Sequence, residues 1–305
     1  LMTHTSGLPP YAPVSELQEK YGSPNPKGLM EYISTCKREF KPQTKFQYSC
    51  LNYITLQHII ETITGQSLRV FAKENIFDIL GMQYTDYLPT IQQQDGKWIN
   101  TVACPWMDWI APTEKQKDGS VLCGQVHDPL ARILNGGISG NAGIFSNAND
   151  IGILAAALLN GGEYNGHRIL SPLGVKTMCT VPRELTAFGR TPGWDIFSPY
   201  ASNKGDLFSP NTFGHTGYTG TSIIIDPDND TAVILLVNAV HPEDRHSIVR
   251  LRSLVANAVA ASICPPAQVY TDHYYKRFLQ FETETPISPK DIVMVGNSLT
   301  ENGGN

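Results

Sequence analysis

Two runs of β-branched and aliphatic residues joined by a turn place the strongest constraint on the fold. They lie within residues 221–240, which read TSIIIDPDNDTAVILLVNAV. Asp, Pro and Asn favour turns, so the central DPDND segment predicts a β-hairpin with antiparallel strands. Helical patterns lie on both sides of this hairpin along the chain. We therefore expect a mixed α/β (α+β) fold with antiparallel strands, and not a doubly wound parallel sheet.

Four segments show apolar residues at the spacing of an α-helix. They are residues 51–64, 70–82, 149–160 and 247–263. Gly65 predicts the end of the first helix, and an Asn or Ser ahead of the third predicts its N-cap. Residues 83–135 contain several tryptophans and prolines but few periodic runs. This segment is expected to form long excursions over the scaffold.

The composition is that of a globular protein that can bury a sizeable core. The 305 residues are 41% hydrophobic and 17% charged, with a net charge of −5,. This acidic balance gives no indication of a nucleic-acid partner. No apolar run reaches the roughly 18–20 residues of a membrane span, and no signal peptide is visible.

Six cysteines are scattered along the chain without a C-x-x-C pair. They are Cys36, Cys50, Cys104, Cys123, Cys179 and Cys264. This spacing gives little support for zinc, and neither a metal nor a cofactor is predicted. A domain of this size does not need a disulfide framework, so mostly free, buried thiols are expected.

The first candidate site is Tyr48, which stands directly ahead of the helix predicted over residues 51–64. The positive end of a helix dipole favours a phenolate, and a phenolate can act as a general base. The alternative is that Tyr48 packs on the core as a loop aromatic, with Ser49 as the helix cap.

The second candidate site is the glycine-rich segment GHTGYTGTS, residues 214–222. Glycines in a strand indicate close approach of another group to the backbone. The side chains of His215 and Thr216 could hold a carboxylate there, and free N–H groups could face an oxyanion. The alternative is an edge strand with a solvent-facing histidine.

A third candidate lies within residues 124–146, where His127 and Asp128 are adjacent in a glycine-rich segment. They could form a catalytic pair. Adjacent His and Asp in a loop more often make a local hydrogen bond, which is the favoured interpretation.

Five motifs in order along residues 1–262 carry a family resemblance. They are LMTHTSGLP, FQYSCLNY, IFDILGM, GISGNAGIFSNANDI and FGHTGYTGTSIIIDPDND. The chain resembles the serine β-lactamase and penicillin-binding-protein family, in its branch of class C β-lactamases, D-alanyl-D-alanine carboxypeptidases and esterases. The resemblance implies an antiparallel sheet flanked by helices, plus a mostly helical subdomain.

The resemblance also implies a serine hydrolase that forms an acyl-enzyme with an ester or peptide of cell-wall or acylated-glycan type. Tyr48 would be the general acid/base, His215 an electrostatic group, and the Tyr218 N–H an oxyanion donor. Cys50, Asn52, Thr216 and Gly217 would lie against the substrate, with Gly217 bare so that the acyl group fits. A periplasmic or secreted location is implied. The alternative is a catalytically inactive binding or structural module in a multidomain protein.

Two positions depart from the family pattern. Cys50 stands where the family has Asn or Asp, and Asn52 is hypothesised to replace the lost amide. His215 stands in place of lysine, so carboxylate binding is expected to depend on pH near 6.5.

The family's Ser-x-x-Lys pair belongs upstream of the THTSG motif, so residues 1–263 are expected to be an N-terminally incomplete domain. The chain's one Ser-x-x-Lys begins at Ser34, after the wrong motif, and an exposed helical face is favoured for it. His4 and Ser6 are expected to brace the opening loop.

The C-terminal tail carries a separate resemblance. Residues 264–290 are expected to be a linker or a packed arm. Residues 291–305 begin DIVMVGNSLT and resemble the first block of the GDSL (SGNH) esterases. Ser298 would match the nucleophile of a second catalytic domain, with Asn297 in place of the usual aspartate.

Overall fold

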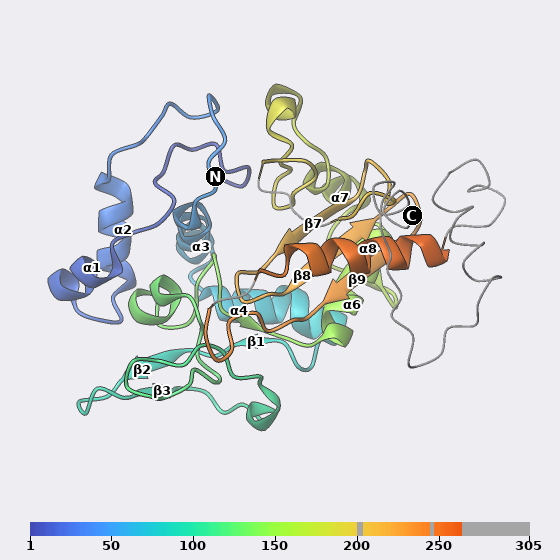
Figure 1. The fold of residues 1–305 in the computed structure, drawn as a ribbon. Coiled ribbons are helices and arrows are strands. Elements are labelled where there is room, and N and C mark those ends of the chain that lie inside the picture. Colours follow the sequence, from blue (N-terminus) through green and yellow to red (C-terminus); the bar gives the residue numbers. More distant parts are fainter. Residues whose placement is uncertain (200–203, 245–246, 264–305) are drawn as a thin grey trace, which may run out of the picture. The chain divides into compact units, whose positions relative to one another are not determined.

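The computed structural model describes residues 1–199, 204–244 and 247–263. Leu1–Asn257 form one compact unit and Ala258–Asn305 form a second. The tail with Ser298, and the linker ahead of it, lie outside the described residues. The predicted mixture of helices and antiparallel strands is confirmed (Figure 1).

The first part of the chain is helical. Its helices are α1 (Val14–Tyr21), α2 (Pro26–Thr35), α3 (Cys50–Thr64), α4 (Leu68–Ala72), the π-helical η1 (Lys73–Phe77) and α5 (Asp78–Leu80). The helices predicted over 51–64 and 70–82 are thus confirmed, although α1 has no counterpart among the predictions. Gly65 ends α3 in the left-handed conformation, with φ of 72°, as glycine does at a helix end.

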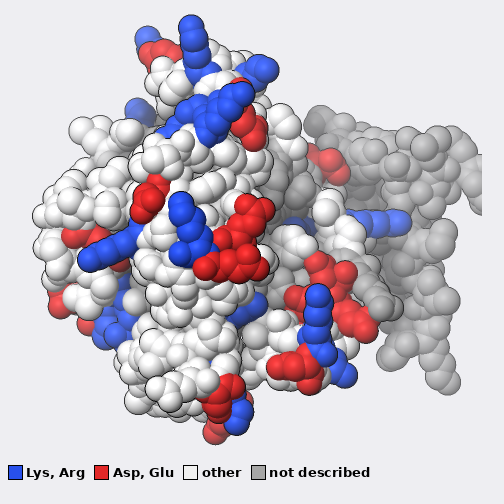
Figure 2. Space-filling view, turned by 90° about the vertical axis from the view of Figure 1, so that its left-hand side faces the viewer, with Lys and Arg blue, Asp and Glu red and all other residues white. Residues whose placement is uncertain are grey.

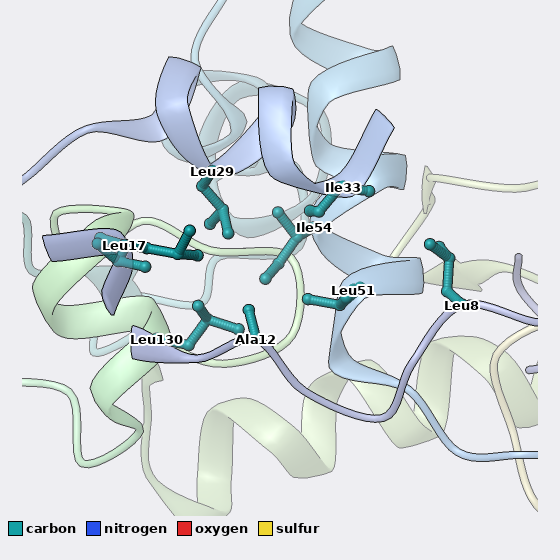
Figure 3. Packing of buried hydrophobic residues seen from close by; sticks show 9 residues of the cluster. Leu8, Ala12, Leu17, Leu29, Ile33, Leu51, Ile54 and Leu130 are labelled. Atoms are coloured by element: carbon teal, nitrogen blue, oxygen red, sulfur yellow. The ribbon is translucent and has the colours of Figure 1, made fainter. Parts of the chain in front are cut away.

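A cluster of aliphatic side chains holds these helices together. In Figure 3, side chains of α1, α2 and α3 point toward one another and toward Leu130. The buried members are Leu8, Ala12, Leu17, Leu29, Ile33, Leu51, Ile54, Leu130 and Leu134. Because Leu51 and Ile54 extend from the first turn of α3, this cluster fixes the end of the helix that follows Tyr48.

Short strands and helices occupy residues 83–135, which were predicted to be irregular, and the segments that follow. Strand β1 (Asp86–Tyr87) pairs with β4 (Ile144–Phe145), β2 (Thr90–Gln92) with β3 (Trp98–Asn100), and β5 (Glu163–Tyr164) with β6 (His167–Arg168). The remaining helical segments here are η2 (Met107–Trp109), the π-helical η3 (Leu130–Leu134), α7 (Pro172–Met178) and η4 (Arg183–Phe188).

The predicted hairpin is present in a three-stranded antiparallel sheet. Its strands are β7 (Phe213–Thr216), β8 (Ser222–Asp226) and β9 (Thr231–Leu235), in that order. Asp226 is fully buried and accepts hydrogen bonds from the Ser209 hydroxyl at 2.7 Å and the Asn229 amide at 2.7 Å. These bonds satisfy the buried carboxylate and hold the turn.

Helices α6 (Ala148–Leu159) and α8 (Val249–Ile263) confirm the two remaining helix predictions. The Asn147 side chain accepts from the Asp150 N–H at 2.8 Å, which confirms an asparagine N-cap on α6,. Ala155 and Leu158 of α6 pack with Phe213 and Ile225 of the sheet.

Charges of both signs are interspersed on the face of the molecule that Figure 2 shows. Among the described residues, no helix is long and apolar enough to cross a membrane, and no cluster of potential metal ligands occurs. The five described cysteines are free, as predicted. Cys123 is exposed and the others are half-buried, so the expectation of buried thiols is wrong.

Truncation of Ile54 tests the aliphatic cluster. Ile54 is 2% exposed and Ile63, on the same helix, is 78% exposed. Ile54→Ala should lower the free energy of unfolding by about 2–5 kcal/mol, because it leaves a cavity in the core. Ile63→Ala should change it by less than about 0.5 kcal/mol. Denaturant unfolding measures both, and equal effects would contradict this packing.

Candidate active site

Tyr48 lies where the N-terminal loop, the start of α3 and strand β7 meet. The N-terminus lies beside the start of α3 in Figure 1. The Tyr48 ring stacks on His4 with 4.3 Å between centroids, and the His215 ring lies 6.2 Å away. The structure therefore brings the first two predicted clusters together.

The His4 side chain is buried and its tautomer is set by its neighbours. Its Nδ1 accepts from the Ser49 N–H at 3.1 Å and lies 3.1 Å from the Asn52 Nδ2. Nδ1 is therefore an acceptor, and the proton of the neutral ring belongs on Nε2. Burial, and then the positive charge of Arg190, lower the pKa of His4 to about 2.

Asn52 is fully buried and uses both ends of its amide within the fold. Its Nδ2 faces His4, and its Oδ1 accepts from the Ser6 hydroxyl at 2.5 Å. Burial and these contacts favour a bracing role for Asn52 over the hypothesis that it replaces the amide lost at Cys50. The expectation that His4 and Ser6 brace the opening loop is confirmed.

Ser49 does not cap α3. Its hydroxyl donates to the Pro9 carbonyl at 2.5 Å, and α3 has no side-chain cap bond. Ser49, the residue that follows Tyr48, therefore ties the start of α3 to the opening loop.

Cys50 is half-buried beside the amide of Asn141. Burial, and then the charge of Asp128, raise the pKa of the thiol to about 11, although a hydrogen bond with Asn141 opposes them. The Asn141 Oδ1 accepts from the Ser139 hydroxyl at 2.6 Å, and its Nδ2 makes a long contact of 3.4 Å with the Asp128 carboxylate. An amide thus stands next to the position where the family has one. Asn141 belongs to the GISGNAGIFS motif, but nothing in the surrounding sequence indicated that it lies beside Cys50.

His215 makes hydrogen bonds through both ring nitrogens. Its Nε2 lies 2.7 Å from the Arg190 Nη2, which can only donate, and its Nδ1 lies 2.9 Å from the Thr216 carbonyl, which can only accept,. His215 is thus neutral, with its proton on Nδ1. Burial and the Arg190 charge lower the pKa of His215 to about 4. The expectation that its charge titrates near pH 6.5 is wrong.

Arg190 places a permanent positive charge beside His215, which stands where the family pattern has a lysine. It is 1% exposed, and its Nη1 donates to the Asp195 carboxylate at 2.8 Å. Its guanidinium carbon lies 5.7 Å from the centroid of the Tyr48 ring. Sequence analysis missed this residue, because an arginine in the turn-rich segment GRTPGWD looks like a solvated surface residue.

The Tyr218 side chain is 74% exposed and joins the third predicted cluster to the second. Its ring stacks on His127 at 5.7 Å, and its hydroxyl donates to Asp244 at 2.5 Å. His127 lies 3.2 Å from the Glu114 carboxylate. Asp128 instead accepts from the Tyr11 hydroxyl at 2.9 Å, so pairing of His127 with Asp128 is wrong.

The glycines of the second cluster are needed for contacts within the hairpin. A Cβ on Gly214 would lie 2.3 Å from the Ile223 carbonyl oxygen, and one on Gly217 would lie 2.3 Å from the Thr221 hydroxyl oxygen. Both distances are far inside van der Waals contact. Close packing on the β8 backbone therefore excludes a side chain at Gly214, whereas a side chain at Gly217 would require the Thr221 hydroxyl to move.

Ser34 lies on the exposed face of α2, as the helical interpretation predicted. Its hydroxyl donates to the Glu31 carbonyl of the same helix at 2.8 Å. This bond is typical of serine within a helix.

Because His4 and His215 are held neutral, acid should destabilise the fold. Each has an ordinary pKa of 6.5, against about 2 for His4 and about 4 for His215 in the folded protein. Below pH 6.5 the unfolded chain therefore binds more protons than the folded protein. The free energy of unfolding consequently decreases as the pH decreases. The His4 contribution is up to about 1.4 kcal/mol per pH unit.

Urea unfolding at pH 7 and pH 5 measures this loss. His4→Gln should reduce the difference between the two pH values, whereas His58→Gln, at an exposed position on α3, should leave it unchanged. An identical difference in the His4 variant and the wild type would contradict the neutral, buried state of His4.

The chain is similar in sequence to known proteins. A protein of Escherichia coli (strain K12) named "Putative D-alanyl-D-alanine carboxypeptidase" is 34% identical over 257 residues, covering 79% of this chain and 56% of the relative. A protein of the same name from Salmonella gallinarum is 32% identical over 257 residues, with the same coverage. The chain thus spans about half the length of these curated relatives.

Solved structures show the same fold at low sequence identity. A penicillin-binding protein homolog from Caulobacter crescentus matches with a TM-score of 0.57 and 15% identity, over 85% of this chain and 70% of that one. A β-lactamase from Mycobacterium bovis matches with a TM-score of 0.53 and 18% identity, over 86% and 72%. A family model described as Beta-lactamase matches residues 1–257. The chain belongs to the β-lactamase family.

Proposed function

We propose that this chain is the greater part of a serine hydrolase domain that works through an acyl-enzyme on an ester or peptide. The observation that carries the proposal is the position of Tyr48 between His4 and the Arg190–His215 pair, in a β-lactamase-family fold. The relatives named as carboxypeptidases support hydrolysis of this kind.

Tyr48 is proposed as the general acid/base. A serine oxygen bonds to the carbonyl carbon of the substrate, and the serine proton passes through Tyr48 to the leaving group as its bond to carbon breaks. Water then attacks the acyl-enzyme, which releases the acid and returns the proton to serine. Tyr48 is a phenolate before it takes the serine proton and again after it gives that proton up, and the Arg190 charge, 5.7 Å from the ring, stabilises this phenolate,.

The strand β7 is proposed to hold the carboxylate of the substrate. Among the described residues, the Thr216 hydroxyl has no protein partner, so it can donate to a bound carboxylate. Arg190 is too buried to make this contact and acts through space and through His215. Cys50 and Gly217 are proposed to lie along the acyl group, and Asn141 to offer the amide that Cys50 lacks. Asn52 is assigned the bracing role that its contacts support.

The nucleophile is proposed to come from a Ser-x-x-Lys segment ahead of Leu1 in a longer protein. The family pattern places it there, and Ser34 is engaged with its own helix. The domain is proposed to end near residue 263, with 264–290 as a linker and Ser298 as the nucleophile of a second, GDSL-type domain. A cell-wall or acylated-glycan substrate and a periplasmic or secreted location follow from the family resemblance.

Active-site labelling tests the proposal. A fluorophosphonate or penicillin probe should label a serine outside residues 1–290 in the protein made from the complete coding sequence. Tyr48→Phe should slow labelling by a factor of about 10² or more, because it removes the proton carrier. Tyr84→Phe, at an exposed position, is the matched control. Mass spectrometry locates the label.

Three outcomes would contradict the proposal. Labelling confined to Ser34 would exclude the upstream nucleophile, and an unchanged rate in Tyr48→Phe would remove Tyr48 from the mechanism. Well-folded protein that takes up neither probe would favour the alternative, an inactive binding or structural module.

Replacement of the Arg190–Asp195 pair tests the fixed charge. Arg190→Met is combined with Asp195→Asn, because Arg190→Met alone would leave a buried, unpaired carboxylate. The double variant should lose about 10- to 100-fold in kcat/KM for a carboxylate-bearing substrate at pH 7.5. Without Arg190, one of the two causes that lower the pKa of His215 is lost and burial remains, so the ring should protonate at a higher pH than in the wild type and restore part of the loss in acid,. Parallel pH profiles of variant and wild type would exclude this role.

A further inference from the structure

Backbone hydrogen bonds hold the loop between β7 and β8. The Gly217 N–H donates to the Thr221 carbonyl at 2.7 Å, and the Gly220 N–H donates to the Gly217 carbonyl at 3.1 Å. The Ala239 N–H donates to the Thr219 carbonyl at 2.7 Å. This loop contains the peptide group that links Gly217 to Tyr218, whose N–H is the proposed oxyanion donor.

Arg252, on the first turn of α8, contacts both ends of this loop. Its side chain is 7% exposed, and its Nη2 donates to the Gly217 carbonyl at 2.9 Å and to the Thr221 carbonyl at 3.0 Å. One nitrogen thus joins the two ends of the loop. Hydrogen bonds from a charged donor are shorter and stronger than those between neutral groups.

The planarity of the peptide bond transmits this contact to the next residue. In a trans peptide the carbonyl of Gly217 and the N–H of Tyr218 point in opposite directions. Because Arg252 and the Gly220 N–H both hold the carbonyl, the Tyr218 N–H is turned to the side opposite Arg252. A cation on the carbonyl oxygen also polarises the peptide and makes its N–H a stronger donor.

We infer that Arg252 is a positioning residue for the oxyanion donor of this site. It fixes the orientation of the Gly217–Tyr218 peptide and increases the positive charge on the Tyr218 N–H. Arg252 does not touch the substrate in this role. The inference rests on the proposed function, since it needs an oxyanion to form beside Tyr218.

If Arg252 contributed only to the stability of the fold, the Gly217–Tyr218 peptide would be unchanged in a variant that is folded. Arg252→Met removes the charge and both bonds, and Arg252→Lys restores a charge with different geometry. Arg250→Met is the matched control, because Arg250 is exposed on the same turn of α8. Thermal unfolding followed by circular dichroism establishes that each variant is folded.

Nitrogen NMR of the 305-residue protein labelled with 15N-tyrosine reads the peptide directly. The Tyr218 amide signal is assigned by its loss in Tyr218→Phe. Since a hydrogen bond to a carbonyl shifts the next amide nitrogen, Arg252→Met should move the Tyr218 signal upfield and Arg252→Lys should move it less. Arg250→Met should leave it in place. An unmoved Tyr218 signal in folded Arg252→Met would overturn the inference.

Kinetics of the full-length protein test the catalytic consequence. Arg252→Met should lower kcat by about 10- to 100-fold, less than or equal to the loss of a whole oxyanion donor, with little change in KM. Arg252→Lys should recover part of the rate. If Tyr48→Phe abolishes labelling while Arg252→Met acylates like Arg250→Met, the proposed function stands and this inference fails. If the wild type does not acylate at all, the proposed function fails and takes the catalytic role of Arg252 with it, whatever the Tyr218 signal does.

Discussion

The buried pair of Arg190 and Asp195 is the interaction on which the rest of the candidate site depends. Removing two charges from water costs several kcal/mol each, and close contact with further hydrogen bonds must compensate. Arg190 meets this need by donating to Asp195 at 2.8 Å and to His215 at 2.7 Å. The Ser198 hydroxyl donates to the same carboxylate at 2.6 Å. Charge and orientation at the site therefore come from one network.

The neutral state of the two histidines follows from their burial and then from that charge. A cation beside a buried imidazole disfavours a second positive charge, and both His4 and His215 are affected in this way,. Tyr48 is thus flanked by a neutral aromatic ring and a fixed cation. A site built like this keeps its charge across the pH range in which a lone histidine would lose it.

Local patterns predicted the elements that position the site but not all of its residues. The β-branched hairpin, the Gly65 helix end and the asparagine cap of α6 depend on neighbours in sequence, so the sequence predicted them correctly. Arg190 and Arg252 have ordinary local surroundings in sequence, and only the fold reveals that each is buried against backbone or side-chain acceptors. Asn52 was hypothesised to replace the amide because it is close to Cys50 in sequence, whereas Asn141, which lies beside Cys50 in the fold, comes from a distant segment of the chain.

The central claim is that Arg190 carries the positive charge of the site and that burial together with Arg190 holds His215 neutral. Imidazole nitrogen NMR of His215 across pH 5 to 8 tests it most directly, with the signal assigned by its loss in His215→Gln. The structure predicts a neutral ring protonated on Nδ1 throughout, with a pKa of about 4. Titration of His215 near pH 6.5, or a proton on Nε2, would contradict the account.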